Sequence, residues 1–155
     1  MITFVKSDIN QIYVEQKIFN SNTEYNSIAF NKKHLENKDI LDQYSESEKL
    51  KTERYLVSKD ESIIGILEYG MSSPRAKKPW LSLLIIDNRY QGQGYAKETY
   101  YAYENLMKDK QVESIQIAVH AINKKALNFW TTLGFEKYDE RLFEGNHYYS
   151  LEKQL

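Results

Sequence analysis

Two glycines stand close together near the centre of the chain, in the segment Gln91-Gly92-Gln93-Gly94-Tyr95-Ala96. The chain has only six glycines, and this pair lies between an apolar run over 80–86 and an amphipathic segment over 96–107. Glycine accepts a positive φ angle and lets a ligand approach the main chain closely. A helix that begins here adds unpaired N–H groups and the positive end of its dipole. Together these features predict a site for an anionic group such as a pyrophosphate, although a turn that merely needs glycine has the same pattern.

Two common phosphate-binding designs do not fit this turn. A nucleoside-triphosphate loop needs Lys followed by Ser or Thr after its last glycine, whereas Gly94 is followed by Tyr95 and Ala96. A dinucleotide-binding turn needs a third glycine where this chain has Lys97, and it usually lies in the first strand–helix unit of a domain. The turn therefore predicts a pyrophosphate site of another design.

Neither cysteine nor histidine indicates a metal site. The chain has no cysteine, which excludes a disulfide framework, a thiolate metal site and a catalytic cysteine. The three histidines, His34, His120 and His147, lack the spacing of metal ligands, so no metal is expected.

The composition is that of an ordinary globular chain. Its 155 residues are 41% hydrophobic and 28% charged, which fits one domain over 1–155. A formal net charge of −1 argues against a nucleic-acid partner. No apolar run reaches the ~18 residues that a membrane span needs. The N-terminus has no signal-peptide pattern, so we expect a cytoplasmic protein.

The elements that must position the glycine turn are clearest in the second half of the chain. The apolar run Trp80 to Ile86 predicts a strand that is covered on both faces. A helix follows the glycines, and a second helix opens at Asn123 and ends at Gly134. Further strands are predicted over 114–119, 135–142 and 147–151, so the class is α/β, with a mixed sheet and helices on its faces (α+β).

The first half is harder to interpret. It contains a short strand over 2–6 and a hairpin whose strands are 54–57 and 63–67. Two helices are predicted from weak apolar spacing. One is capped by Ser7 or Asp8 and carries Ile9, Ile12 and Tyr13, and the other runs from Lys33 to Tyr44 with Leu35 and Leu41 as anchors.

Two motifs in this order resemble the GNAT superfamily of acetyl-CoA-dependent N-acetyltransferases. The family signature Gln/Arg-x-x-Gly-x-Gly/Ala after a central strand is matched by residues 91–96. A second family motif is matched about 30 residues later by Asn123-x-x-Ala126-x-x-Phe129-Trp130-x-x-Leu133-Gly134-Phe135. The resemblance covers roughly residues 52–151, and it implies a three-layer fold with a splayed, mostly antiparallel central sheet.

The resemblance also implies roles for individual residues around acetyl-CoA as co-substrate. The N–H groups of the glycine turn would hold the pyrophosphate, and the central strand would pair with the pantetheine arm. A strand-end N–H, such as that of Ile86, would polarise the thioester carbonyl. The implied cofactor-binding residues are Leu84, Ile85, Ile86, Gln91, Gly92, Gln93, Gly94, Tyr95, Ala96, Lys97, Asn123 and Trp130.

The implied reaction is direct transfer of the acetyl group to a small-molecule or peptide amine. Many members carry a Tyr acid where this chain has Trp130, whose indole is not a usable acid for the departing thiolate. His120, Tyr138 and Tyr148 are candidates for that acid, and Glu68 and His120 are candidates for the base. The indole in place of Tyr keeps a second hypothesis open, which is a non-catalytic acyl-CoA sensor on the same fold. A homodimer also stays open.

Overall fold

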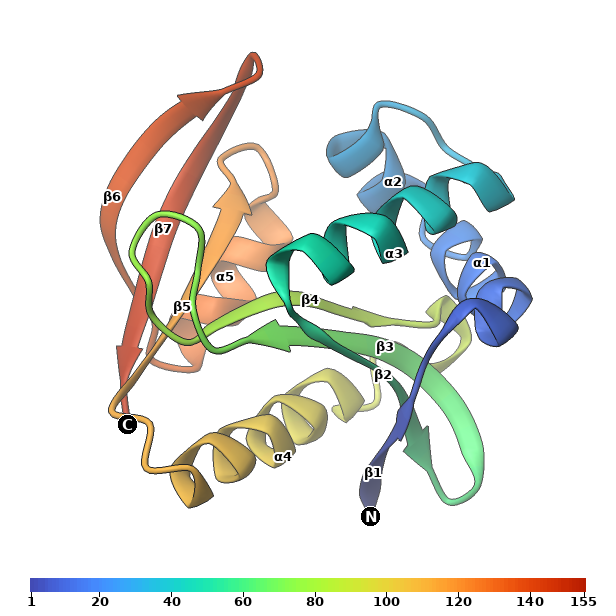
Figure 1. The fold of residues 1–155 in the computed structure, drawn as a ribbon, viewed down its shortest axis with the longest axis horizontal. Helices are drawn as coiled ribbons and strands as arrows, with labels where there is room; N and C mark the ends of the chain where they lie inside the picture. The colour runs from blue at the N-terminus through green and yellow to red at the C-terminus, as the bar shows by residue number, and fades with distance from the viewer.

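The computed structural model describes residues 1–155, which form one seven-stranded sheet with helices on both faces (Figure 1). The strand order is β1-β2-β3-β4-β5-β7-β6, and every neighbouring pair is antiparallel except β4 and β5. The strands are β1 (Ile2–Lys6), β2 (Glu53–Lys59), β3 (Ser62–Gly70), β4 (Trp80–Ile86), β5 (Ser114–His120), β6 (Glu136–Phe143) and β7 (Asn146–Gln154).

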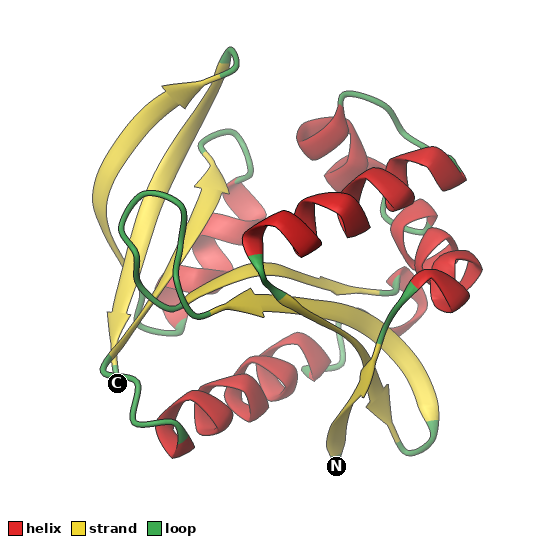
Figure 2. Cartoon of the chain, in the orientation of Figure 1, coloured by secondary structure: helices red, strands yellow, loops and turns green.

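The N-terminal helices cover one face of the sheet, and the two later helices cover the other (Figure 2). None of them is long and apolar enough to cross a membrane. The helices are η1 (Ile9–Gln11), α1 (Ile12–Asn20), α2 (Thr23–Phe30), α3 (Asn37–Leu50), η2 (Asn88–Tyr90), α4 (Tyr95–Asp109) and α5 (Lys124–Thr132).

Two hydrophobic cores lie on opposite faces of the sheet. The larger core holds Tyr100 and Tyr103 of α4, and the smaller one holds Phe19 of α1 and Ile40 of α3. Strand β4 contributes to both, since Ile86 belongs to the larger core and Ile85 to the smaller. The continuous apolar run of this strand follows from its burial on both faces.

Strands β4 and β5 diverge from a single point of contact. Their only paired residues are Trp80 and Gln116, whereas β5 pairs with β7 along its whole length, from Ser114 to His120. The main chain of β4 therefore has an open edge on the side of β5 over most of its length. A β-bulge falls in the same strand, because Glu68 of β3 pairs with Leu83 while Tyr69 pairs with Leu81.

The predicted helix over Lys33 to Tyr44 is wrong at both ends, since α3 runs from Asn37 to Leu50, and in both of its anchors, Leu35 and Leu41. A reciprocal capping box between Glu36 and Asp39 begins α3 only at Asn37, so the buried Leu35 lies in the preceding loop. Within α3, Ile40 faces the core while Leu41 is 38% exposed. Helix α2, which has only eight residues, was not predicted from the sequence.

The first predicted helix is present, but two of its apolar residues face outward. Asp8 accepts a hydrogen bond from Asn10 N and caps a short turn of 3₁₀ helix before α1. Ile12 is buried, whereas Ile9 and Tyr13 are exposed.

Candidate functional site

The glycine turn after β4 has the backbone that its sequence predicts. Gly92 has a φ of +76° and Gly94 has a φ of +82°. A Cβ atom built on either glycine would have no atom within 4 Å, so both face open space. A side chain at these positions would occupy that space and would strain the backbone.

Six consecutive main-chain N–H groups at this turn, from Gly92 to Lys97, have no hydrogen-bond partner in the protein. The first amide of the following helix that is paired is that of Glu98, which donates to Gly94 O at 3.1 Å. These free donors converge at the positive end of the α4 dipole, and α4 is 15 residues long. The turn is therefore built to bind an anion through the main chain.

A pocket of about 690 Å³ extends from this turn along the end of β4 to helix α5. Its walls are the end of β4, the glycine turn, the start of α4, one side of α5, the α1–α2 connection and helix α2. Of the residues predicted for cofactor binding, Gln93 alone is absent from the wall, and its side-chain amide donates to Arg89 O at 3.4 Å. The predicted residues that line the pocket are Leu84, Ile85, Ile86, Gln91, Gly92, Gly94, Tyr95, Ala96, Lys97, Asn123 and Trp130.

The α1–α2 connection is a part of the wall that the sequence did not indicate. Asn22 and Gln91 both donate side-chain hydrogen bonds to the carbonyl of Ile86, at 3.0 and 2.8 Å. Ser21 accepts a hydrogen bond from Asn88 N at 3.0 Å. These contacts hold the connection against the end of β4 across more than 60 residues of sequence. The polar segment over 20–23 carries no motif that could have shown this contact.

Helix α5 forms the opposite wall. The side chain of Asn123 accepts a hydrogen bond from Ala126 N at 3.1 Å and so caps the helix, as its position in the motif predicts. Trp130 is buried and packs edge-on against Tyr100 and Phe135. The indole is thus part of the larger core as well as of the pocket wall.

None of the three predicted catalytic residues, Glu68, His120 and Tyr138, lines this pocket. Glu68 lies in a buried polar network on the α3 side of the sheet, where its carboxylate accepts hydrogen bonds from four side chains. Tyr138 is on the outer strand β6 and is half exposed. Neither side chain lines the pocket.

His120 ends β5, the strand on the far side of the gap. Ile115 and Ile117 of this strand belong to the larger core, so alternation directs His120 to the opposite face, that of α1–α3. Its ring lies 4.4 Å from the ring of Tyr148, and its Nε2 atom is buried without a hydrogen-bond partner. Burial lowers the pKa of His120 below its ordinary value of 6.5. A neutral imidazole keeps one nitrogen able to accept a proton, but Nε2 is closed off from solvent and His120 does not line the pocket, so a substrate meets this ring only after its surroundings move.

Comparison with known proteins agrees with this geometry. The model of the acetyltransferase (GNAT) family matches residues 13–135, which is most of the chain and includes both motifs. The chain belongs to the GNAT acetyltransferase family. The resemblance on which the sequence analysis relied is therefore confirmed.

Solved structures confirm the GNAT fold, a splayed and mostly antiparallel sheet between layers of helices. An acetyltransferase from Thermus thermophilus superposes with a TM-score of 0.83 at 17% identity and covers 100% of this chain and 97% of its own. A Salmonella typhimurium acetyltransferase that modifies the N-terminal serine of a ribosomal protein has a TM-score of 0.79 at 12% identity, over 99% and 95% of the two chains. Spermidine N-acetyltransferase from Vibrio cholerae, in complex with CoA and spermine, has a TM-score of 0.74 at 16% identity, over 99% and 95%. A comparison with curated protein sequences gave no significant match.

Proposed function

We propose that this GNAT protein transfers the acetyl group of acetyl-CoA directly to a primary amine. The observation that carries the proposal is the row of six unpaired N–H groups over 92–97, beside two glycines that leave the space in front of them open. Such a row suits a diphosphate better than any uncharged group, because each anionic oxygen can accept from several amides. Neighbours of this fold are in complex with CoA, which supports the same ligand here.

The pantetheine arm of acetyl-CoA fits the open edge of β4. The amide of Asp87 donates to Ile64 O at 2.7 Å, so the alternation of an antiparallel ladder turns the main-chain groups of Leu84 and Ile86 toward the gap. The carbonyl of Ile86 already accepts from Asn22 and Gln91, which leaves its N–H and the groups of Leu84 for the ligand. An extended arm with two amides can pair with such an edge as an added strand would.

In the proposed reaction the amine nitrogen attacks the thioester carbonyl, the C–N bond forms and the C–S bond breaks. We assign His120 as the base that takes the proton of the amine, because it ends the strand across the gap from β4 and its ring is neutral near pH 7. The thiolate of CoA leaves without an acid from Trp130 and is protonated from solvent, since a thiolate is a competent leaving group near neutral pH.

A second function, an acyl-CoA sensor without catalysis, is favoured by two observations. Trp130 occupies the position of the family's Tyr, and the carboxylate of Glu68 is fully occupied by protein donors. Release of thiol from acetyl-CoA, measured over a panel of polyamines, amino acids and peptide N-termini, separates the two functions. Turnover with any amine supports the transferase, and tight binding without turnover across the panel supports the sensor.

The amide row is tested by Gly94→Val with Gly145→Val as its matched control. Gly145 lies in the β6–β7 turn with a φ of +80° and open space around it, so valine strains both backbones alike. Only Gly94→Val puts a side chain where the diphosphate would lie. We expect it to weaken CoA binding about 100-fold or more in calorimetry, while Gly145→Val binds as the wild type does. Equal affinities for the two variants would contradict the assignment.

A further inference from the structure

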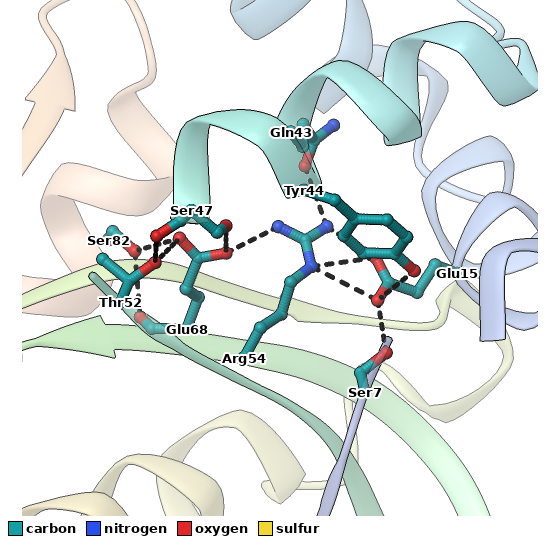
Figure 3. A network of polar contacts seen from close by, with 9 residues as sticks. All are labelled: Ser7, Glu15, Gln43, Tyr44, Ser47, Thr52, Arg54, Glu68 and Ser82. Atoms are coloured by element: carbon teal, nitrogen blue, oxygen red, sulfur yellow. Dashed lines mark hydrogen bonds and ion pairs between the residues drawn. The ribbon is translucent and has the colours of Figure 1, made fainter. Parts of the chain in front are cut away.

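A buried ion network links β2 to helix α1 and to strand β3 (Figure 3). Arg54 stands between Glu15 and Glu68, with its Nη1 2.7 Å from Glu68 Oε1 and its Nε 3.0 Å from Glu15 Oε1. All three residues are at most 7% exposed. Hydroxyls of Ser7 and Tyr44 complete the shell of Glu15.

Both oxygens of the Glu68 carboxylate are occupied by hydrogen-bond donors of the protein. Its Oε1 accepts from Arg54 and from Ser47 at 2.8 Å. Its Oε2 accepts from Thr52 at 2.8 Å and from Ser82 at 3.3 Å. A carboxylate with four donors, one of them a guanidinium, is held in one orientation. These contacts are those of a residue with a structural role and not of a general base.

The Glu68 carboxylate holds the bulge of β4 in place. Ser82 is the extra residue between Leu81 and Leu83 in the ladder with β3, and Glu68 is the residue opposite. The Ser82 hydroxyl reaches back to both the carbonyl and the carboxylate of Glu68, at 3.2 and 3.3 Å. A bulge is a local break in the ladder whose geometry its surroundings must fix. Here a buried charge network fixes it.

The bulge decides where the rest of β4 points. Beyond it the ladder with β3 is regular, and the groups of Leu84 and Ile86 turn into the gap. A one-residue slip at the bulge would exchange the groups that face β3 with those that face the gap. The N–H groups that would meet the thioester therefore depend on the geometry at Ser82.

We propose that Glu68 and Ser82 are positioning residues that hold the β4 bulge so that the main-chain N–H groups of β4 are aimed at the thioester carbonyl. The inference rests on the proposed function, because it gives those N–H groups the task of stabilising the oxyanion. Arg54 serves as the buried counter-charge that keeps Glu68 in place.

The test uses Ser82→Ala with the conservative Ser82→Thr, and Glu68→Gln with Glu53→Gln as its control. Glu53 is a half-exposed carboxylate of the neighbouring strand that pairs with Lys6 on the surface. We expect Ser82→Ala and Glu68→Gln to lower kcat about 10- to 100-fold, with Kd for CoA within about twofold of the wild type. Ser82→Thr, which keeps the hydroxyl, and Glu53→Gln should stay close to the wild type.

Two readouts separate positioning from proton transfer and from a folding defect. The infrared band of ¹³C-labelled acetyl-CoA should shift toward its value in free solution in Ser82→Ala and Glu68→Gln, because the bound carbonyl is less polarised. The acidic limb of the pH–rate profile should stay in place. If Glu68→Gln does not fold, Ser82→Ala, which removes only a hydroxyl, decides the matter alone.

Three results would overturn the proposal. They are an unchanged carbonyl band in Ser82→Ala, loss of the acidic limb in Glu68→Gln, which would make Glu68 the base, and failure of Ser82→Thr to restore the rate. Wild-type protein that binds no acetyl-CoA would overturn the proposed function as well. Normal wild-type turnover with an unaltered Ser82→Ala would overturn this inference only.

Discussion

At the scale of single residues, the environment of a side chain decides its chemistry more than its type does. Glu68 and His120 are both candidates for a base on sequence grounds. The structure surrounds the first with four hydrogen-bond donors and leaves Nε2 of the second with none. A group whose lone pair is free and whose charged form is disfavoured by burial is suited to accept a proton near pH 7.

The pH dependence of the reaction follows from His120. Burial disfavours the imidazolium, so the pKa of His120 in the folded protein lies below 6.5, and the ring is neutral above that pKa. We expect kcat/KM to be level above pH 6.5 and to fall as the pH drops through the lowered pKa, because only the neutral ring accepts the proton. A series of rate measurements from about pH 4.5 to about pH 8 checks this. An acidic limb centred above the ordinary pKa of 6.5 would contradict it.

A substitution tests the same assignment without a pH change. His120→Gln should lower kcat about 100-fold or more, since general-base catalysis contributes that much, and leave the Kd for CoA unchanged. The matched control is His147→Gln, because His147 is exposed on β7, where its ring contacts Glu140 and Tyr149 and lies outside the pocket. Equal rates for the two variants would remove His120 from the mechanism.

The sequence predicted some of these residue environments and could not predict others. The glycine turn and the cap at Asn123 are local features, whose backbone angles and hydrogen bonds depend on residues at most a few positions away. The side chains around Glu68 and His120 come from distant parts of the sequence. Glu68 receives hydrogen bonds from residues 14 to 21 positions away, and Tyr148 approaches His120 only because β5 and β7 are paired. Such contacts depend on topology, which spacing alone does not give.

At the scale of elements, helix α3 shows how register decides which residue anchors a helix. Ile40 and Leu41 are adjacent and both apolar, but Ile40 is fully buried under the helix while Leu41 is 38% exposed. The sequence pattern favours Leu41 as an anchor, and the predicted start at Lys33 lies four residues before the start of α3 at Asn37. Glu36 and Asp39 do not match the usual Ser/Thr-x-x-Glu/Gln signature of a capping box, so the sequence has no clear start signal for this helix.

This difference predicts a matched pair of stabilities. Ile40→Ala should lower the free energy of unfolding by about 2–4 kcal/mol, because it leaves a cavity in the smaller core. Leu41→Ala should change it by less than about 1 kcal/mol, because its side chain is largely in solvent. Chemical denaturation monitored by circular dichroism measures both. Similar losses for the two variants would mean that α3 packs in another register.

At the scale of the whole molecule, the sheet separates two cores and carries a charged network on one side. The larger core, under α4 and α5, is apolar and aromatic. The smaller core lies beside Arg54, Glu15 and Glu68, so the N-terminal helices are held to the sheet by an ion network as well as by apolar contact. A buried network of this kind is costly to break on one side only.

Arg54→Met should therefore destabilise the protein by about 3–5 kcal/mol, because two carboxylates stay buried without their counter-charge. Lys6→Met, which removes one partner of an exposed pair with Glu53, should change stability by less than about 1 kcal/mol. Denaturant titrations of both variants compare the buried with the exposed pair. A loss of less than about 1 kcal/mol for Arg54→Met would show that the network relaxes or admits water.

The single bridge between Trp80 and Gln116 has a consequence for the unliganded protein. Strands β1 to β4 and strands β5 to β7 share one ladder contact. The sheet is therefore weakly connected at the place where a ligand would enter. An extended ligand that pairs with the open edge of β4 would fill the gap and add contacts between the two halves of the sheet. The melting temperature of the protein should then rise with the concentration of the acyl donor, because the donor binds only the folded state. The stability of the sheet would therefore depend on how much acyl donor is present.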